Sequence, residues 1–415
     1  MSVQGVNNRL LTDDIIAKEA LRLLKNNLVA APLVNRSYEK VFAKVGDTIS
    51  LKKPFRTKTT SGRTLGKQPL IDQTIPFQIG YQENFGVEVT MRDRTLSLQQ
   101  FSERYLKSGI VQIANKIDKS IFDAMATKGF FTSNVGNAVT TKSFLYGSAY
   151  MGNVAVPDDG MRRATLNLMD AADVSDATSK VFNEKMVQDS IQKGYTGALA
   201  GFDVFQSQNI PTYEPGAGWI GTPLVKGANQ TGSSIIVDGF TTDALTLKKG
   251  DIFTIAGVYE INPQNYTSTG RLQSFVVTAD VAVASNQATI SISPAINDGS
   301  LTTVDASGSS LSLAAYQNVS AKPADNAAIT LVGTAGNVYK QNFLFHKDAV
   351  TLAMVDLELP QSAVVKARVR DEDSGLSMSM TGAFDINNHT EITRIDAVWG
   401  CEVIYPEMLH RLITN

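Results

Sequence analysis

The chain has 415 residues, enough for two or three domains, and its 38 basic and 40 acidic residues give a formal charge of −2. This balance excludes the strongly basic composition of a dedicated nucleic-acid-binding protein. The single cysteine, Cys401, excludes an intramolecular disulfide framework and a cysteine zinc cluster. No apolar run reaches the roughly 18 residues of a membrane span, and no signal peptide is visible, so we expect a soluble protein of a reducing compartment.

Residues 1–36 are predicted to form an N-terminal arm. Thr12 is a suitable cap for the amphipathic stretch DDIIAKEALRLLKNN, and Pro32 ends the helical pattern. The apolar side chains of this stretch recur at helical spacing: Ile15, Ile16, Ala20, Leu23 and Leu24. An isolated helix of this length is marginal in water, so we expect it to dock on a larger surface.

Residues 37–85 are predicted to contain two strands joined by a long basic loop. The expected strands lie at residues 48–51 and 75–79. The sequence has no acidic residue between Asp47 and Asp72. The loop carries these basic residues: Lys52, Lys53, Arg56, Lys58, Arg63 and Lys67. Because it has so few apolar residues, this segment cannot build a core of its own.

Three interpretations of the basic loop remain open. The loop is suited to contact an acidic surface of a neighbouring subunit, because opposite charges steer and orient association. It is also suited to bind phosphates, although Phe55 is the only aromatic residue interleaved for base stacking. The third interpretation is a solvated loop without a partner.

A long helix is predicted over residues 98–128. Ser97 begins a capping-box pattern, and Gly129 is placed to end the helix. At 1.5 Å per residue the helix would span roughly 46 Å, well beyond an average globular helix. Its apolar face changes direction at the pair Ser108-Gly109, where a bend is expected. We predict that these side chains form a core along the helix: Leu98, Phe101, Tyr105, Ile110, Ile113, Ile117 and Ile121.

Residues 130–221 have the pattern of an α/β layer. Helices are predicted at residues 165–172 and 183–193, and a strand is predicted at residues 202–205.

From about residue 222 to residue 341 the pattern becomes β only. Strand candidates are separated by Gly, Asn, Asp and Ser turns at residues 235–237, 252–256, 274–278, 288–293 and 329–332. We predict a small β-barrel or sandwich. A helix-containing pattern resumes at residues 346–360, so the β region is an insertion inside another domain. Strands at 202–205 and 343–346 are expected to adjoin, which would bring the two ends of the insertion together.

No catalytic, cofactor or metal site is predicted. The sequence lacks phosphate-binding, dinucleotide-binding, zinc-protease and nucleophile-elbow motifs. His346, His389 and His410 lie far apart in the sequence and are expected at surface or turn positions. Residues 370–373 are expected to form a solvated turn rather than a cation site. Cys401 is expected to be a small buried hydrophobic residue. We therefore expect a protein that is not an enzyme and needs no cofactor.

The order of these parts resembles the major capsid protein of tailed bacteriophages, which has the Hong Kong 97 type fold. An N-terminal arm, a basic two-stranded loop, a long helix, an α/β lobe and a closing C-terminal strand follow one another. The inserted β region is similar to the insertion domain of P-twenty-two-type coat proteins, notably in the segment LKKGDIFTIAGV. The segments IFDAMATKG and NFLFHKDAVTLAMVDLELP are also similar to that group.

The resemblance implies an α+β fold with the parts of a capsid subunit. The basic loop would be the E-loop, at residues 48–79, and the long helix would be the spine helix, packed beside a strand at residues 392–406. The implied domains are an N-terminal arm at 1–36, an E-loop region at 37–85, a P-domain with the spine helix at 86–129 and 396–415, an A-domain at 130–221 and 342–395, and a β-barrel insertion domain at 222–341. The six basic residues of the E-loop would contact a neighbouring subunit.

The resemblance also implies a function and its partners. The chain would be a structural major capsid protein that self-assembles, with a separate scaffolding protein, into the icosahedral shell around a phage double-stranded DNA genome. Its partners would be copies of itself in hexamers and pentamers, the scaffolding protein, the portal protein, packaged DNA held non-specifically on the inner face, and possible decoration proteins, with no membrane. The protein would be found in the virion capsid and would assemble in the cytoplasm of the bacterial host.

Three alternative functions remain open at this stage. An encapsulin-type protein cage shares the same fold but encloses enzymes. A nucleic-acid-binding protein would use the basic hairpin at residues 52–67. A polysaccharide-binding protein is suggested only by the polar β region at residues 222–341. Formation of closed particles would separate the two shell proteins from the other two classes.

Overall fold

The computed structural model describes residues 13–37, 48–59, 62–63, 71, 73–90, 102–179, 197–241, 246–304, 308, 310–359, 361, 365–371, 375–386 and 390–415. The helix predicted at 183–193 lies outside the described residues, as do Lys67, Leu98, Phe101 and His389. The chain forms two compact units. The first contains Met1–Leu51, Pro76–Ile121 and Val350–Glu402, and the second contains Lys52–Ile75, Phe122–Ala349 and Val403–Asn415.

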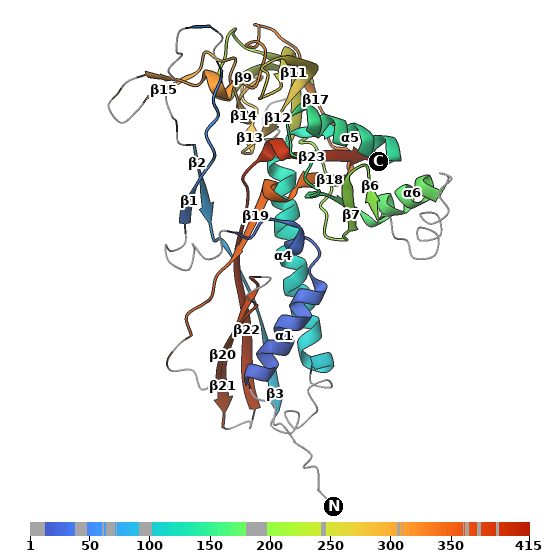
Figure 1. Ribbon diagram of the computed structural model, residues 1–415, viewed down its shortest axis with the longest axis vertical. Helices are drawn as coiled ribbons and strands as arrows, with labels where there is room; N and C mark the ends of the chain where they lie inside the picture. Colours follow the sequence, from blue (N-terminus) through green and yellow to red (C-terminus); the bar gives the residue numbers. More distant parts are fainter. Residues whose placement is uncertain are drawn as a thin grey trace, which may run out of the picture. The chain divides into compact units, whose positions relative to one another are not determined.

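The first unit is built on a β-sheet with the strand order β19-β22-β21-β20, and β3 also pairs with β22. The bounds of these strands are β3 (Tyr81–Thr90), β19 (Val350–Met354), β20 (Val365–Arg370), β21 (Ser377–Asp385) and β22 (Thr390–Val403). Strand β22 pairs antiparallel with β21 and with β3. Figure 1 shows β3, β20, β21 and β22 side by side.

The N-terminal helix α1 (Asp13–Asn27) docks on this sheet, next to β20 and β21. Its side chains Ile16, Ala20 and Leu24 are buried, as the helical spacing predicted. A short 3-10 helix, η1 (Ala31–Leu33), follows. Beyond it, the N–H of Asn35 donates to the carbonyl of Val350 over 2.9 Å, which adds the end of the arm to β19.

The described part of the long helix begins at Ser102 and ends at Lys128, the predicted end. The α-helix α4 spans Lys107–Lys128, and a π-helical turn, η3 (Ser102–Leu106), precedes it. The structure buries Ile110, Ile113, Ile117 and Ile121 and leaves Tyr105 half-buried. Gly109 allows a close approach rather than only a bend, because a Cβ atom there would lie 2.4 Å from the ring of Phe85 on β3.

A fully buried acid, Asp118, interrupts the apolar face of α4. Its Oδ2 accepts the N–H of Val29 over 2.8 Å, and its Oδ1 accepts the N–H of Ala30 over 2.9 Å. These N–H groups lie between α1 and η1, so the carboxylate fixes the turn that follows the arm helix. Burial raises the pKa of Asp118 to about 6, although bonds from the backbone of residues 29–31 favour its charged form.

Strand β22 packs against α4 through Trp399, a fully buried side chain. The Trp399 Nε1 donates to the Ser120 Oγ over 2.9 Å, and the Ser120 Oγ donates to the carbonyl of Ile117 over 2.7 Å. Cys401 is also buried, as predicted, and its Sγ lies 3.3 Å from the Ser120 carbonyl. These contacts place β22 beside the spine helix.

The second unit contains a mixed sheet with the strand order β4-β23-β18-β5-β7-β6, which we call the host sheet. The bounds of its strands are β4 (Phe131–Ser133), β5 (Arg162–Leu166), β6 (Ala198–Leu199), β7 (Phe202–Gln206), β18 (Lys340–His346) and β23 (Leu409–Thr414). Two helices, α5 (Thr141–Asn153) and α6 (Leu168–Ser179), belong to the same unit. Their buried side chains Phe144 and Val174 join the core that contains Phe202 and Leu344.

Three predictions for this region are wrong. Residues 165–172 are not one helix, because β5 runs to Leu166 and α6 begins at Leu168. Residues 346–360 contain no α-helix among those described, because the 3-10 turn η5 (Lys347–Ala349) leads directly into β19. All five residues of β19 are buried, and a strand buried on both faces gives the same continuous apolar run as a helix. Finally, β7 and β18 do not adjoin, because β5 lies between them.

The inserted β region forms a six-stranded sheet with the order β17-β11-β12-β14-β9-β8. The strands are β8 (Gly221–Val225), β9 (Gly232–Phe240), β11 (Ile252–Ile261), β12 (Ser268–Val277), β14 (Gln287–Ile296) and β17 (Ile329–Leu331). The five predicted strands fall on five of these and are confirmed. The Val225 N–H donates to the carbonyl of Ala327 over 3.0 Å, so β8 meets the segment before β17 and closes the sheet into a barrel.

The barrel has its own apolar core, and alternate residues along its strands point into it. Strand β9 buries Ile235 and Val237, and β14 buries Ile290 and Ile292. The core also contains Trp219, whose Nε1 donates over 2.7 Å to the Oδ2 of a buried acid, Asp251. Strand alternation in the sequence predicted this inner face because side chains alternate across a strand.

The two ends of the insertion lie together. Tyr213 and Tyr339 exchange two backbone hydrogen bonds of 2.8 Å, one in each direction. This pair is where the barrel joins the host sheet, so residues 214–338 form the insertion in the structure, compared with the predicted 222–341. The expectation that the ends meet is therefore correct, although the flanking strands are not neighbours.

Buried Arg411 on β23 connects the insertion to its host. Its Nη1 donates to the carbonyls of Gly129 and Gly250, each over 3.2 Å. Its Nη2 donates to the Gln341 Oε1 over 3.0 Å, and its guanidinium carbon lies 4.9 Å from the ring centre of Tyr213. Burial lowers the pKa of Arg411 to about 10. One cation thus holds the end of α4, a turn of the barrel and the host sheet.

We expect residues 214–338, expressed alone, to fold cooperatively. The barrel is closed, has its own core, and begins and ends at one backbone pair. Thermal melting followed by circular dichroism would check this expectation, and amide exchange would show protection in β9 and β14. The matched control is the same fragment with Ile290→Asp, which places an unpaired acid in the core and should abolish the transition. A fragment that melts without a cooperative transition would contradict an autonomous barrel.

The compact units divide the chain differently from the predicted domains. Residues 350–395, assigned to the A-domain, lie in the first unit with the arm and most of α4. Residues 403–415, assigned to the P-domain, lie in the second unit, where β23 joins the host sheet. None of the helices in the described part of the chain is both long and apolar enough to cross a membrane.

Candidate functional site

The base of the basic loop is the candidate interaction site, and all the residues that form it belong to the second unit. Two short strands, β1 (Thr48–Lys52) and β2 (Thr74–Gln78), lead into and out of the loop. Pairing extends one step further, because the Lys53 N–H donates to the Gln73 carbonyl over 2.8 Å. We call residues 53–58 with residues 71 and 73 the loop stem.

The three basic residues of the stem all contact their own subunit. The Arg56 Nη2 lies 2.8 Å from the Glu407 Oε1, and both side chains are partly exposed. The Lys53 Nζ lies 5.1 Å from the ring centre of Tyr405, and the Lys58 Nζ lies 4.5 Å from that of Tyr266. Cations at these distances are attracted to the faces of aromatic rings.

Partial burial shifts the pKa values of two side chains at the stem, Lys53 and Tyr266. Burial lowers the pKa of Lys53, while the nearby Glu407 carboxylate acts in the opposite direction. Burial also raises the pKa of the Tyr266 hydroxyl. Arg56 is ion-paired with the Glu407 carboxylate, and Lys53 lies close enough to interact with the same carboxylate, so the stem brings two cations to one acid. The arrangement stabilises a docked stem.

The backbone of the stem is held by tyrosine hydroxyls from the insertion. The Tyr316 hydroxyl donates to the Ile71 carbonyl over 3.2 Å and accepts from the Arg56 N–H at 3.5 Å. The Tyr266 hydroxyl lies 3.0 Å from the Ala315 carbonyl and 3.4 Å from that of Thr57. The outgoing and the returning strand of the stem are therefore both contacted by the barrel.

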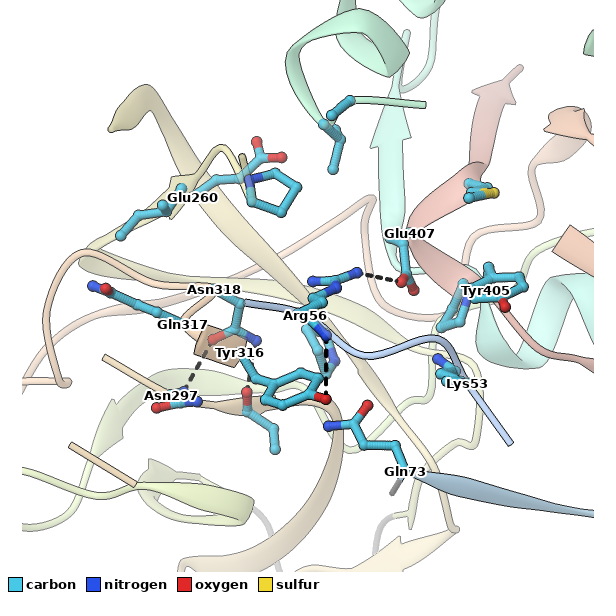
Figure 2. Close-up of a pocket in the computed structure, with 18 of the residues that line it drawn as sticks. Lys53, Arg56, Gln73, Glu260, Asn297, Tyr316, Gln317, Asn318, Tyr405 and Glu407 are labelled. Atoms are coloured by element: carbon cyan, nitrogen blue, oxygen red, sulfur yellow. Dashed lines mark hydrogen bonds and ion pairs between the residues drawn. The ribbon is translucent and has the colours of Figure 1, made fainter. Parts of the chain in front are cut away.

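An open cavity of about 760 Å³ lies between the stem, the barrel and the C-terminal segment. Figure 2 shows Arg56 directed at Glu407 and Tyr316 lying beneath the stem. Asn297, Gln317 and Asn318 of the barrel line one side. The lining combines amides, aromatic rings and aliphatic groups with four charged side chains, Lys53, Arg56, Glu260 and Glu407. Such a mixture of apolar and polar groups suits contact with a protein surface.

The remaining predicted residues are dispersed. Arg63 lies exposed beyond the stem, and Lys52 is exposed at the end of β1, whereas Lys67 lies outside the described residues. The structure thus brings Lys53, Arg56 and Lys58 together and does not place Lys67. Whether any of them meets a neighbouring subunit stays a prediction.

The two histidines in the described part of the chain, His346 and His410, each bond to a different side chain. His346 is buried with its Nε2 3.1 Å from the Asp159 Oδ1. His410 is buried with its Nε2 2.7 Å from the Ser133 Oγ, and burial lowers its pKa to about 3. Surface or turn positions predicted for these two are therefore wrong. Within the described ranges, no three His, Cys, Asp or Glu side chains are grouped to bind a metal ion.

The acidic stretch at residues 370–373 is partly described. The Asp371 Oδ2 lies 2.6 Å from the Lys25 Nζ, and Arg370 lies 3.4 Å from the Asp356 Oδ1. Asp371 therefore forms an ion pair with Lys25 of the arm helix α1. The next two acids of the stretch lie outside the described residues.

Several important residues gave no signal, or a weak one, in the sequence. Glu407, Tyr266 and Tyr316 contact the stem across more than two hundred residues of chain, a separation that no local pattern reveals. Arg411 looked like an ordinary basic residue near the end of a strand. Asp118 did leave a signal, because a lone acid on the apolar face of an amphipathic helix requires a buried partner.

A family model described as P22 coat protein, gene protein 5, matches residues 6–411 of the chain. No curated protein sequence matches it significantly. A solved chain from Mycobacterium phage Che8 is 14% identical, with a TM-score of 0.44, over 94% of this chain and 91% of that one. The capsid of Ralstonia phage GP4 is 7% identical, with a TM-score of 0.45, over 92% and 87%.

Another solved structure matches a smaller part of the chain. The CUS-3 coat protein I-domain is 28% identical over 28% of this chain and 97% of that domain, with a TM-score of 0.19. Because the TM-scores of all three structures are below 0.5, the family match carries the assignment and the superpositions do not.

Proposed function

Because this chain belongs to the P22 coat protein family and is therefore a structural protein of a bacteriophage capsid, we propose that it builds its icosahedral shell with a separate scaffolding protein. The shell would enclose double-stranded DNA and incorporate a portal protein, and it would assemble in the host cytoplasm. Copies of the chain would be arranged as hexamers and pentamers. The family match over residues 6–411 is the observation that supports this proposal.

Two properties of the chain agree with a shell subunit. Its near-zero net charge and its low content of charged residues, 19%, suit a surface that is covered by other copies. Its cavity is lined by amides, aromatic rings and aliphatic groups together with four charged side chains, a mixture that suits contact with a protein surface. The family match gives no support to the encapsulin-type cage or to the nucleic-acid-binding alternative.

Assembly of purified chain with its scaffolding protein tests this proposal. Closed shells are expected in negative stain and at the void volume of a sizing column. Omission of the scaffolding protein is the control, and it should give irregular or open particles. A chain that stays monomeric under every assembly condition would contradict the proposal.

We also propose that the E-loop contacts a neighbouring subunit chiefly through its exposed residues beyond the stem. Arg63 is exposed there, whereas Arg56 already has Glu407 as its partner. An exposed cation has more to gain from an acidic neighbouring surface than one already paired. The domain roles given by the family resemblance are retained as part of this proposal, with residues 350–402 grouped with the spine helix.

Charge reversal separates these two arginines. Arg63→Glu should leave the melting temperature of the subunit unchanged and reduce shell yield at least tenfold, because like charges opposed at an interface cost several kcal/mol. Arg56→Glu should also reduce yield, and Glu407→Arg should restore it in the double variant because the pair is internal. Sedimentation of assembly reactions would measure the yields. Normal yield from Arg63→Glu, or no rescue in the double variant, would contradict this division of roles.

A further inference from the structure

Two tyrosines of the insertion, Tyr266 and Tyr316, form what we call the tyrosine clamp. The Tyr316 hydroxyl bonds to the Ile71 carbonyl and the Arg56 N–H, which lie on opposite strands of the loop stem. The Tyr266 hydroxyl lies within bonding distance of the Thr57 carbonyl. All these hydroxyl contacts go to backbone atoms, so they depend on the path of the stem backbone.

The backbone around each tyrosine of the clamp is held by hydrogen bonds within the barrel. Tyr266 sits in the turn between β11 and β12 with φ of 56°, and its N–H donates to the Asn262 carbonyl over 2.9 Å. Tyr316 ends the 3-10 turn η4 (Ala314–Tyr316). Buried Asn297 holds the start of that turn by donating from its Nδ2 to the Leu313 carbonyl over 2.9 Å.

The two halves of the clamp are also connected to each other. The Tyr266 hydroxyl lies 3.0 Å from the carbonyl of Ala315, within η4. Lys58 adds a contact from the stem side, because its ammonium lies 4.5 Å from the Tyr266 ring centre. The barrel therefore presents one preformed surface to both strands of the stem.

The direction in which a long loop with few apolar residues leaves the subunit depends on the contacts that hold its base. Strand pairing ends at Lys53 and Gln73, so hydrogen bonding between the two strands does not extend to the clamped residues in the described part of the loop. Beyond that point the barrel supplies the contacts that fix the backbone. Without them, the stem could leave the subunit in many directions, because fixing each residue opposes its conformational entropy.

We propose that the tyrosine clamp positions the E-loop, so that the insertion domain decides where the basic tip of the loop is presented to a neighbouring subunit. Tyr266 and Tyr316 are positioning residues that act on the loop through its backbone. This inference rests on the proposed role of the E-loop in subunit contacts. It gives the insertion a function in assembly in addition to its own folding.

Limited trypsin digestion of the unassembled subunit tests the clamp directly. In the wild type, cleavage after Arg63 should be fastest, with Arg56 and Lys58 protected. In Tyr266→Phe with Tyr316→Phe, cleavage after Arg56 and Lys58 should rise about twentyfold, and in either single variant about fivefold, because cleavage follows the population of the open stem. Tyr259→Phe is the matched control, since Tyr259 is an exposed tyrosine of the same barrel outside the clamp.

A second measurement, the yield and diameter of assembled shells, tests whether the clamp affects assembly. The double variant should keep the melting temperature of the barrel and should assemble into fewer shells, with a broader range of diameters in electron micrographs. Equal cleavage rates in the double variant and the wild type would overturn the clamp. Faster cleavage with shells of unchanged yield and diameter would overturn its role in directing the loop. If wild-type chain forms no shells, the proposed function fails, while the cleavage rates still decide whether the clamp exists.

Discussion

Replacing Arg411 with methionine is expected to destabilise the second unit by about 2–4 kcal/mol, because a buried acceptor that loses its donor costs about 1–3 kcal/mol. Methionine keeps much of the apolar length but removes every donor. The carbonyls of Gly129 and Gly250 would then be left buried without this partner. Because these groups lie on α4 and on the barrel, the loss should appear in both.

Urea unfolding of the unassembled subunit, followed by hydrogen exchange in peptides from the end of α4 and from β11 of the barrel, would measure this effect. Lys248→Met is the matched control, because Lys248 pairs with Glu214 and both side chains are about half exposed. Exposed ion pairs contribute about 0–1 kcal/mol, so the control should change little. A loss below about 1 kcal/mol for Arg411→Met would show that other donors replace the guanidinium.

Replacing Asp118 with alanine is expected to destabilise the first unit by about 2–4 kcal/mol, because it leaves the N–H groups of Val29 and Ala30 buried without their acceptor. The turn after the arm helix should be the first part to open. Hydrogen exchange should therefore increase most in residues 28–35. If residues 28–35 exchanged at the wild-type rate in the variant, the Asp118 carboxylate would not be what fixes this turn.

The same residue predicts a pH dependence of stability. The pKa of Asp118 is raised from 3.8 to about 6, so between these values the folded chain binds the proton more tightly than the unfolded chain. The stabilising contribution of this carboxyl is therefore complete below about pH 4 and is lost as the pH rises through 6. Wild-type stability relative to Asp118→Asn should be roughly 1 kcal/mol greater at pH 5 than at pH 7.

Urea unfolding of both chains at the two pH values would measure this difference. Asp14→Asn is the control, because Asp14 is an exposed acid on α1 and its removal changes the net charge by the same amount. The control should show no comparable change relative to the wild type. An opposite sign for Asp118→Asn would mean that backbone donors outweigh burial at this site.

The barrel was the most predictable part of the fold, because alternation along strands such as β14 appears directly in the sequence. The two helix predictions that failed have different causes. Strand β19 is buried along its whole length, and a continuous apolar run does not distinguish a buried strand from a helix. The range 165–172 crosses the boundary between β5, which ends at Leu166, and α6, which begins at Leu168. Helix α5 was missed because its capping box uses Ser143 rather than Glu or Gln, and its Gly147 lowers helix propensity while packing on Leu344.

Only the basic loop of the candidate site was predictable from the sequence, and the residues that contact it were not. A run of lysines and arginines without acids identified the loop, because charge is visible in the sequence. Its partners Glu407 and Tyr316 were not predictable, since they approach the stem only after the barrel and the last strand have been placed. The same reasoning applies to Arg411, whose burial depends on three distant segments meeting around it.

The meeting of Tyr213 and Tyr339 has a consequence for the order of folding. Strands β5 and β7 of the host sheet are synthesised before the insertion, whereas β18 and β23 follow it. Joining them across an unstructured insertion would cost roughly 4 kcal/mol in loop-closure entropy. A barrel that folds first has already brought its ends together and removes most of that barrier. The insertion then serves as an internal template for its host, and slow refolding of β18 onto β5 is the expected signature of any variant whose barrel forms late.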